Sequence, residues 1–276
     1  MNAEPPATRR FDGKVVIVTG AGNGIGLCIA QTFAEDGASV VVAEVEPSAG
    51  KRAVQTITDA GGSASFVPVD VSDEEQVEAM VETTVKRYGR VDILVNNAGI
   101  VVHKLLIELE REEWDRQLAV QTTGPFLTAK HVARHMIARG GPGKIVNIAS
   151  VAGLTGRIRC GPHCVAKAGV ISLTRVLALE LGQYRINVNA LAPGLVDVPF
   201  QDDEKSLSTA YKNSYLEMLP LGRIGQPIDI ARGVQFLACS DSDWITGQVL
   251  VADGGITAGH YNLQGLQDFT MLGGHL

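Results

Sequence analysis

The chain has 276 residues, of which 45% are hydrophobic and 20% are charged, and its formal net charge is −6 at pH 7. This composition suits a well-filled globular domain and excludes a disordered or coiled-coil protein. The acidic balance, with no Lys/Arg run longer than Arg9-Arg10, also argues against a nucleic-acid partner and favours a small-molecule substrate.

The start of the chain and its cysteines add further expectations. The segment MNAEPPATRR lacks the apolar core of a signal peptide, and no apolar run reaches the ~18 residues that span a bilayer. We therefore expect a soluble, cytoplasmic protein with no membrane partner. Four cysteines are too few and too scattered for a disulfide framework. Cys160, His163 and Cys164 offer three soft ligands, but a structural zinc site needs four, so no metal is expected.

After a polar arm at residues 1–10, short Val/Ile-rich runs alternate with longer segments of helical period. The predicted strands span residues 14–19, 38–44, 65–70, 91–97, 144–150, 185–193 and 248–255. The predicted helices span residues 24–34, 48–60, 73–88, 111–138, 164–181 and 227–238.

Unbroken apolar strands that alternate with helices predict a parallel sheet covered on both faces. The predicted fold class is α/β: one doubly wound, Rossmann-type domain of three αβα layers over residues 11–256. Two segments stand outside the pattern. Residues 198–221 form a polar and aromatic insertion, and residues 257–276 form a Gly-rich tail.

A glycine-rich segment, TGAGNGIG at residues 19–26, follows the first predicted strand and opens the first helix. Its backbone amides and the helix N-terminus can hold a pyrophosphate, although such glycines also occur in ordinary βα turns. Glu44 ends the second strand, where a carboxylate accepts from the ribose hydroxyls of NAD and repels the 2′-phosphate of NADP. The predicted cofactor is therefore NAD, held at this end by Gly20, Asn23, Gly24, Ile25, Gly26 and Glu44.

The third and fourth strands end in further candidates for the cofactor site. Asp70, followed by Val71, can accept from an adenine amino group or cap the next helix. The segment Asn97-Ala98-Gly99 closes the fourth strand, and ligands gather at the carboxyl ends of parallel strands.

Several motifs occur together in one order and spacing: TGAGNGIG, Glu44, Asn96-Asn97-Ala98-Gly99, Ser150, Lys167 and Pro193-Gly194. No single motif is decisive, but the joint pattern over residues 11–255 resembles that of the short-chain dehydrogenase/reductase family. The resemblance implies an NAD-dependent oxidoreductase in which Lys167 bonds the nicotinamide ribose. It also assigns Pro193, Gly194 and Val196 to the cofactor site.

The resemblance places the family's catalytic serine at Ser150 and its lysine at Lys167, but His163 stands where the family has tyrosine. Gln121 takes the place of the family's asparagine, so the resemblance does not carry over the water-mediated proton path attributed to that asparagine. Val198 takes the place of the Thr or Ser that bonds the nicotinamide carboxamide. The predicted catalytic residues are Ser150, His163, Lys167 and Gln121.

Catalysis at His163 would use the neutral imidazole. His163 lies one helical turn before Lys167 on the same face, and Ser150 would hydrogen-bond the substrate oxygen. A lysine cation about 4 Å away opposes imidazolium by up to ~4 kcal/mol at an effective dielectric of ~20, which keeps His163 neutral at pH 7. A neutral imidazole accepts the proton of an alcohol but seldom donates one, so we expect alcohol oxidation to be the faster direction.

The residues before His163 rim the substrate pocket in the resembled fold. Arg157 and Arg159 in this segment could clamp a carboxylate or phosphate, or remain solvated loop residues. Family members are usually tetramers or dimers, and helices 111–138 and 164–181 would face the partner in a homotetramer or homodimer. The residues expected to contact the small-molecule substrate are Ser150, His163, Arg157, His103 and Phe200.

Three functions remain open at this stage. The first is an NAD(H)-dependent oxidoreductase that interconverts a secondary alcohol and a ketone of a small organic substrate with His163 as the proton acceptor or donor. The second is a non-redox enzyme, such as a dehydratase, isomerase or decarboxylase, which the joint loss of Tyr, Asn and Thr favours. The third is a catalytically silent NAD-binding protein, since a fold alone confers no activity.

Overall fold

Seven parallel strands form one sheet in the part of the chain that the computed structural model describes, residues 9–198 and 209–259. Their order is β3-β2-β1-β4-β5-β6-β7, so the direction of winding reverses between β1 and β4. The strands are β1 (Val15–Thr19), β2 (Ser39–Glu44), β3 (Ser63–Pro68), β4 (Ile93–Asn96), β5 (Gly143–Ile148), β6 (Ile186–Pro193) and β7 (Val249–Ala252).

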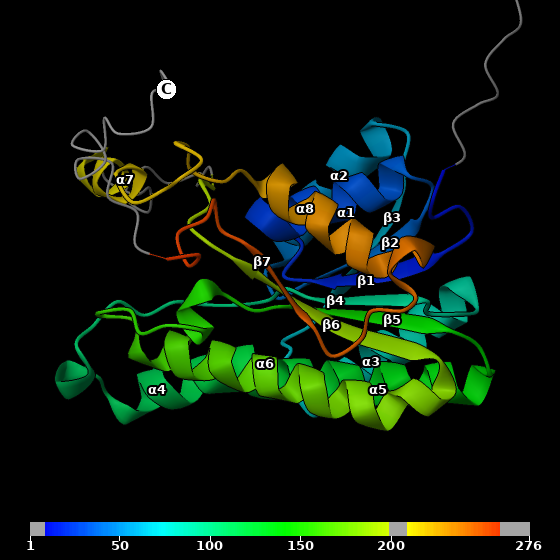
Figure 1. Cartoon of the computed structure of the whole chain (residues 1–276). Coiled ribbons are helices and arrows are strands. Elements are labelled where there is room, and N and C mark those ends of the chain that lie inside the picture. The colour runs from blue at the N-terminus through cyan, green and yellow to red at the C-terminus, as the bar shows by residue number, and fades with distance from the viewer. Residues whose placement is uncertain (1–8, 199–208, 260–276) are drawn as a thin grey trace, which may run out of the picture.

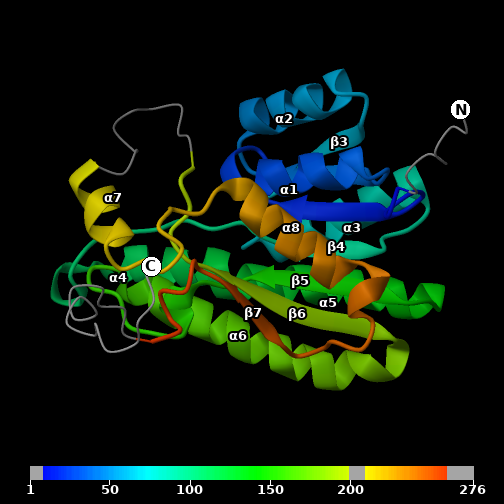
Figure 2. The same ribbon diagram turned by 45° about the horizontal axis from the view of Figure 1, so that its top comes forward.

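Helices cover both faces of the sheet (Figures 1 and 2). One layer holds α1 (Gly24–Glu35), α2 (Pro47–Asp59) and α8 (Pro227–Ala238). The other holds α3 (Glu74–Tyr88), α4 (Arg111–Leu118), α5 (Gly124–Arg139) and α6 (Gly161–Leu181). The predicted single Rossmann-type αβα domain is confirmed. Within the described residues, no helix is long and apolar enough to cross a membrane.

The sheet separates two apolar cores because successive strand residues point to opposite faces. Val16 and Val18 of β1 pack beneath α1 and α8, where Phe33 is fully buried. Ile17, between them, packs on the other face with Met80 of α3 and Met136 of α5. All residues of β1 and residues 40–43 of β2 are buried, which explains why these runs are apolar without alternation. All residues of β5 are buried as well, including the polar Lys144 and Asn147.

Two predicted helices differ from those observed. The segment predicted as one helix over 111–138 is divided by a π-helical turn, Ala119–Thr123, in which the Gly124 amide bonds the Ala119 carbonyl five residues back. Pro125 has no N–H to offer the Gln121 carbonyl, which favours this wider turn. The helix predicted at 164–181 begins earlier, at Gly161, because a proline in the first helical turn needs no hydrogen-bond partner for its nitrogen.

Some predicted segments lie wholly or partly outside the described residues. Residues 1–8 of the predicted arm, residues 260–276 of the predicted tail and Phe200 in the predicted insertion belong to this group. The described end of the insertion forms α7 (Thr209–Leu216).

Candidate active site

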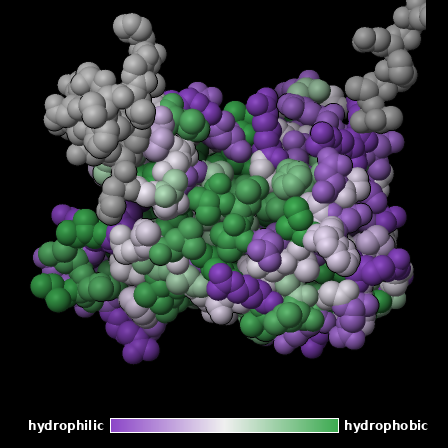
Figure 3. Space-filling model, in the orientation of Figure 1, coloured by the Kyte–Doolittle hydropathy of each residue, from purple (hydrophilic) through white to green (hydrophobic). Residues whose placement is uncertain are grey.

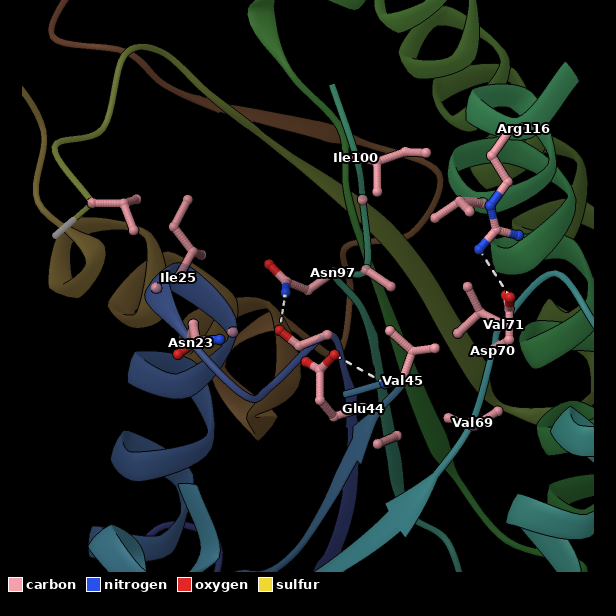
Figure 4. A pocket seen from close by; sticks show the side chains of 18 residues that line it. Asn23, Ile25, Glu44, Val45, Val69, Asp70, Val71, Asn97, Ile100 and Arg116 are labelled. Atoms are coloured by element: carbon pink, nitrogen blue, oxygen red, sulfur yellow. Dashed lines mark hydrogen bonds and ion pairs between the residues drawn. The ribbon is translucent and has the colours of Figure 1, made fainter. Parts of the chain in front are cut away.

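A cavity of about 550 Å³ lies at the carboxyl ends of β1, β2 and β4, where the winding of the sheet reverses (Figure 4). Ligands of doubly wound sheets bind at this position. Most of the residues predicted to bind the cofactor line it: Gly20, Asn23, Gly24, Ile25, Gly26, Glu44, Asp70, Val71, Asn97, Ala98 and Gly99. Val198, which the resemblance places at the carboxamide-binding position, also lines the cavity. Residues that the sequence did not single out for this site complete the lining: Ala43, Val45, Val69, Ile100, Arg116 and Val120.

Gly20 and Gly26 allow the turn after β1 to pack closely on itself and against the turn after β4. A Cβ atom on Gly26 would lie 2.1 Å from the Gly20 carbonyl oxygen, and one on Gly20 would lie 2.8 Å from the Ala98 Cα. The side-chain nitrogen of Asn97, Nδ2, donates to the backbone carbonyls of Thr19 and Gly20, both at 3.0 Å. Asn23 precedes α1 in an extended conformation and its side chain does not cap the helix. The first amides of α1 are therefore available to a phosphate group.

Glu44 and Asp70 stand at the ends of neighbouring strands. The Glu44 carboxylate accepts from the backbone amides of Gly22 and Val45, each at 2.9 Å. Burial opposes ionisation of Asp70, but bonds from Ser72 and the Arg116 guanidinium lower the pKa of Asp70 overall. Figure 4 shows Arg116 turned toward Asp70.

The alternative prediction that Asp70 caps the following helix is wrong. Asp73 is the N-cap of α3, and its carboxylate accepts from the Gln76 amide at 3.1 Å. The Asp70 carboxylate is instead shared between Ser72 and Arg116, which lies 46 positions away along the chain.

The predicted catalytic residues come from β5, α6 and the π-helical turn. Ser150 follows β5, and its hydroxyl oxygen accepts from the Ala152 amide at 3.1 Å. Lys167, on the second turn of α6, is buried and donates from Nζ to the Ile148 carbonyl at 2.6 Å. Burial lowers the pKa of Lys167 to about 8. The ammonium has three donors, so the bond to Ile148 leaves two for a ligand.

His163 and Gln121 are bonded to each other. His163 Nδ1 lies 3.0 Å from Gln121 Oε1, and Gln121 Nε2 donates to the Ile100 carbonyl at 2.5 Å. Because a carbonyl can only accept, the Gln121 nitrogen must face Ile100 and its oxygen must face the histidine. His163 therefore carries its proton on Nδ1 when neutral, and Nε2 is left with the lone pair.

The surroundings of His163 disfavour its charged form. The pKa of His163 is lowered to about 4, most strongly by burial. The positive charges of Lys167 and Arg157 lower it further, followed by His103. The sequence predicted this direction from Lys167 alone, whereas burial is the larger cause. The position of His163 in the first turn of α6 acts in the same sense, because a helix N-terminus repels cations.

A second cavity of about 530 Å³ adjoins Ser150. The loop between Ser150 and α6, the helix α7 and Gly194 contribute to its wall. Of the residues predicted to contact substrate, Ser150, Arg157 and His103 line this cavity, whereas His163 lines neither cavity. Among the residues predicted to bind the cofactor, Gly194 lines this second cavity and Lys167, Pro193 and Val196 line neither.

Residues 20–257 match the protein-family model described as enoyl-(acyl carrier protein) reductase. A crystal structure of a short-chain type dehydrogenase/reductase from Mycobacterium marinum superposes with a TM-score of 0.85 at 33% identity, over 91% of this chain and 98% of that one. The chain belongs to the short-chain dehydrogenase/reductase family. The resemblance predicted from the motifs is thereby confirmed at the level of the family.

Two relatives illustrate the range of this dehydrogenase/reductase family. A 3-oxoacyl-(acyl carrier protein) reductase of Chlamydia muridarum is 42% identical over 244 residues, which are 88% of this chain and 97% of the relative. A cis-4-hydroxycyclohexanecarboxylate dehydrogenase of Sinomonas cyclohexanicum is 38% identical over 249 residues, 90% of this chain and 98% of the relative. The present chain is thus an oxidoreductase of a family that typically uses a nicotinamide cofactor, NAD or NADP.

The cysteines of this family member do not assemble a metal site. Cys160 Sγ lies 3.4 Å from His103 Nδ1, and burial raises the pKa of the Cys160 thiol. Throughout residues 9–198 and 209–259, no group of three His, Cys, Asp or Glu side chains is placed to hold a metal ion.

Proposed function

We propose that the protein is an NAD(H)-dependent oxidoreductase that interconverts a secondary alcohol and a ketone of a small organic substrate, with His163 in the place of the family's tyrosine. The observation that carries the proposal is the bond between His163 Nδ1 and Gln121. It fixes the tautomer that leaves Nε2 as a proton acceptor, one helical turn from Lys167.

The proposed proton acceptor works in one direction better than in the other. With a pKa of about 4, His163 is neutral at pH 7 and can take the hydroxyl proton of an alcohol while the hydride departs. Ser150 would hold the substrate oxygen by a hydrogen bond. Donating a proton to a ketone needs imidazolium, which only about one molecule in a thousand carries at pH 7. Alcohol oxidation is the favoured direction.

His163 lines neither cavity but is linked to residues of both. Gln121 ties it to Ile100, which lines the larger cavity, and its pKa responds to Arg157 and His103, which line the smaller one. A nicotinamide ring in the larger cavity would accept the hydride of a substrate held in the smaller one. This arrangement supports a reaction at the boundary between the two cavities.

The larger cavity fits NAD better than NADP. Glu44 presents a carboxylate beside the glycine-rich turn, which suits ribose hydroxyls and repels a 2′-phosphate. Arg116, the single Arg or Lys among the lining residues that the structure describes, is paired with Asp70. The uncapped start of α1 would receive the pyrophosphate, and the two remaining donors of Lys167 would bond the nicotinamide ribose.

NAD⁺ reduction with a panel of secondary alcohols, and NADH oxidation with the matching ketones, test this function from pH 5 to 9. We expect wild type to oxidise alcohols and His163→Ala to lose at least a hundredfold in kcat, while both bind NAD⁺ equally in calorimetry. Faster ketone reduction than alcohol oxidation at pH 8 would contradict the proposal. Tight coenzyme binding with no turnover of any alcohol would favour a catalytically silent protein.

We further propose that two or four copies of the chain assemble through α5, α6 and the β7 edge. Phe126, Val176 and Leu179 on the two helices are 46%, 47% and 85% exposed. Figure 3 shows a second apolar region over β7 and the adjoining end of α8, where Leu250 and Phe236 are exposed. Light scattering tests this assembly, and the mass of a single 29.2 kDa chain at micromolar concentration would contradict it.

A further inference from the structure

The wall of the smaller cavity is basic. Arg157, Arg159 and His103 line it, and none of the described residues that line it is Asp or Glu. Neither arginine forms a salt bridge with any residue in the described ranges, although the chain as a whole has a net charge of −6. Positive charge therefore gathers beside Ser150, and no carboxylate within the described residues pairs with either arginine.

Arg157 is oriented by its contacts with Tyr211, which also lines the cavity. Its Nη2 donates to the hydroxyl of Tyr211 on α7, and its guanidinium carbon lies 5.8 Å from the centre of the Tyr211 ring. A guanidinium has five N–H donors in a rigid fork, so the bond to Tyr211 leaves four. Arg157 thus has both the charge and the free donors that a planar anion requires.

The charge of Arg157 reaches the proposed reaction centre. It contributes to the lowered pKa of His163 and to that of His103. The charged or titratable groups that act on His163 are Lys167, Arg157 and His103, and each of them opposes imidazolium. An anion held by Arg157 would lie close enough to His163 to act on it in turn.

We propose that the basic wall binds a carboxylate of the substrate, so that the alcohol oxidised beside Ser150 is a hydroxy acid. This inference rests on the proposed alcohol oxidation and names its substrate class. A carboxylate matches the guanidinium fork with two parallel hydrogen bonds, and one such group balances the charge of Arg157. A cavity of about 530 Å³ admits a small molecule of this kind.

Binding of the acid would also strengthen the proton acceptor. A carboxylate on Arg157 offsets the repulsion between the guanidinium and a proton on His163, so the pKa of His163 rises toward its ordinary value when the acid is bound. The substrate would thereby make the imidazole a better base at the moment it is needed. A neutral alcohol would leave the pKa of His163 unchanged.

Matched pairs of acids and esters test the substrate class. NAD⁺ reduction is measured with 3-hydroxybutyrate and mandelate, and with their methyl esters. We expect kcat/KM to favour at least one acid over its ester by about tenfold or more. Arg157→Gln should lower kcat/KM for that acid roughly 10- to 100-fold, as expected for a lost charged pair, and should not lower it for the ester. Arg157→Lys keeps the charge but not the planar fork of donors, so its kcat/KM for the acid should lie between those of wild type and Arg157→Gln.

Arg232→Gln is the matched control, because Arg232 is exposed on α8 and lines neither cavity. It removes the same charge and should leave the acid preference intact. Equal turnover of acids and esters by wild type, or a preference for the phosphate monoester of a diol over every acid, would overturn the carboxylate site while leaving alcohol oxidation standing.

Binding without turnover separates this inference from the proposed function. If no alcohol is oxidised, calorimetry with benzoylformate and its methyl ester still probes the wall. Binding of the acid alone, lost in Arg157→Gln and kept in Arg232→Gln, would support the carboxylate site in an enzyme of different activity. Equal binding of acid and ester, or binding of neither, would reject it.

Discussion

Gln121 and His163 form one hydrogen-bonded unit, with Gln121 Oε1 3.0 Å from His163 Nδ1. The sequence motifs predict that both residues depart from the pattern of the short-chain dehydrogenases, and in the structure these two residues contact each other. Gly99 leaves the room that the longer glutamine needs, since a Cβ there would lie 3.0 Å from Gln121 Nε2. A glutamine that bridges Ile100 and His163 is therefore a positioning residue for the imidazole.

Changing Gln121 should change the protonation of His163. Gln121→Glu places a carboxylate against Nδ1, which stabilises imidazolium and raises the pKa of His163 above its present value of about 4. Gln121→Met keeps the size but removes the acceptor, so both tautomers become populated. Nitrogen-15 NMR of the histidine rings measures both effects directly. An unchanged tautomer in Gln121→Met would show that the bond to Gln121 does not fix the ring.

The pH dependence of activity and stability follows from the low pKa of His163. The neutral, basic form of His163 persists down to about pH 5. Titration of this histidine should therefore cause no decrease in kcat/KM for alcohol oxidation near pH 6.5. Between about pH 4 and the ordinary value near 6.5, the unfolded chain binds a proton that the native chain does not. The stability gained from the neutral ring is thus complete above pH 6.5 and is lost as the pH falls toward 4.

Thermal unfolding from pH 7.5 to 4.5 measures this loss. His163→Asn should unfold with a shallower pH slope than wild type, because the variant has no proton to take up at this position. Equal slopes in the two proteins would mean that His163 titrates normally in the native state.

The elements and the cofactor cavity were predictable because their signals are local. Unbroken apolar runs mark strands such as β1 and β2, and the glycine-rich turn occupies consecutive positions. The bond between Gln121 and His163 joins residues 42 positions apart and depends on the π-helical turn and on the direction of the Ile100 carbonyl. The bond between Arg157 and Tyr211 likewise joins distant segments. No periodicity or motif encodes such contacts, since tertiary packing alone brings their partners together.

Glu44 should decide the choice of coenzyme. Glu44→Ala removes the carboxylate that suits the ribose hydroxyls and is expected to weaken NAD⁺ binding about tenfold, the range of one charged hydrogen bond. The double variant Glu44→Ala/Val45→Arg adds a guanidinium beside the same site and should bind NADP⁺ more tightly than NAD⁺. Calorimetry with both coenzymes measures the change. Glu75→Ala, on the exposed start of α3, is the control, and a similar loss there would argue against a local role for Glu44.

Gly26 and Gly182 make a matched pair for testing the close approach in the cofactor turn. Alanine at 26 would place its methyl group 2.1 Å from the Gly20 carbonyl, so the turn must shift and the free energy of unfolding should fall by about 2 kcal/mol or more. Alanine at 182 meets open space at a helical φ of −57° and should be neutral or stabilising by less than about 1 kcal/mol. Chemical denaturation of both variants measures the difference. Equal stabilities would contradict the contact.

Placing tyrosine at 163 tests whether His163 itself supports catalysis. A phenol has an ordinary pKa near ~10, so Tyr at this position is protonated at pH 7 and can donate to a ketone, unlike a histidine of pKa about 4. We expect His163→Tyr to raise kcat for ketone reduction relative to kcat for alcohol oxidation at pH 7 at least tenfold, with substrate and coenzyme at saturation. The nearby Lys167 ammonium would lower the pKa of that phenol and keep it able to work in both directions.

The size of the new ring requires a second change for a fair comparison. Gln121 reaches His163 in the native site, so Gln121→Asn combined with His163→Tyr shortens that side chain and makes space for the phenol. His163→Phe, which has no ionisable group, is the control for packing and should oxidise no alcohol above background. If wild type is inactive in both directions while the double variant turns over, the histidine has replaced a lost tyrosine without taking over its chemistry. If wild type oxidises alcohols and the double variant gains reduction, the imidazole is a working base whose low pKa sets the direction.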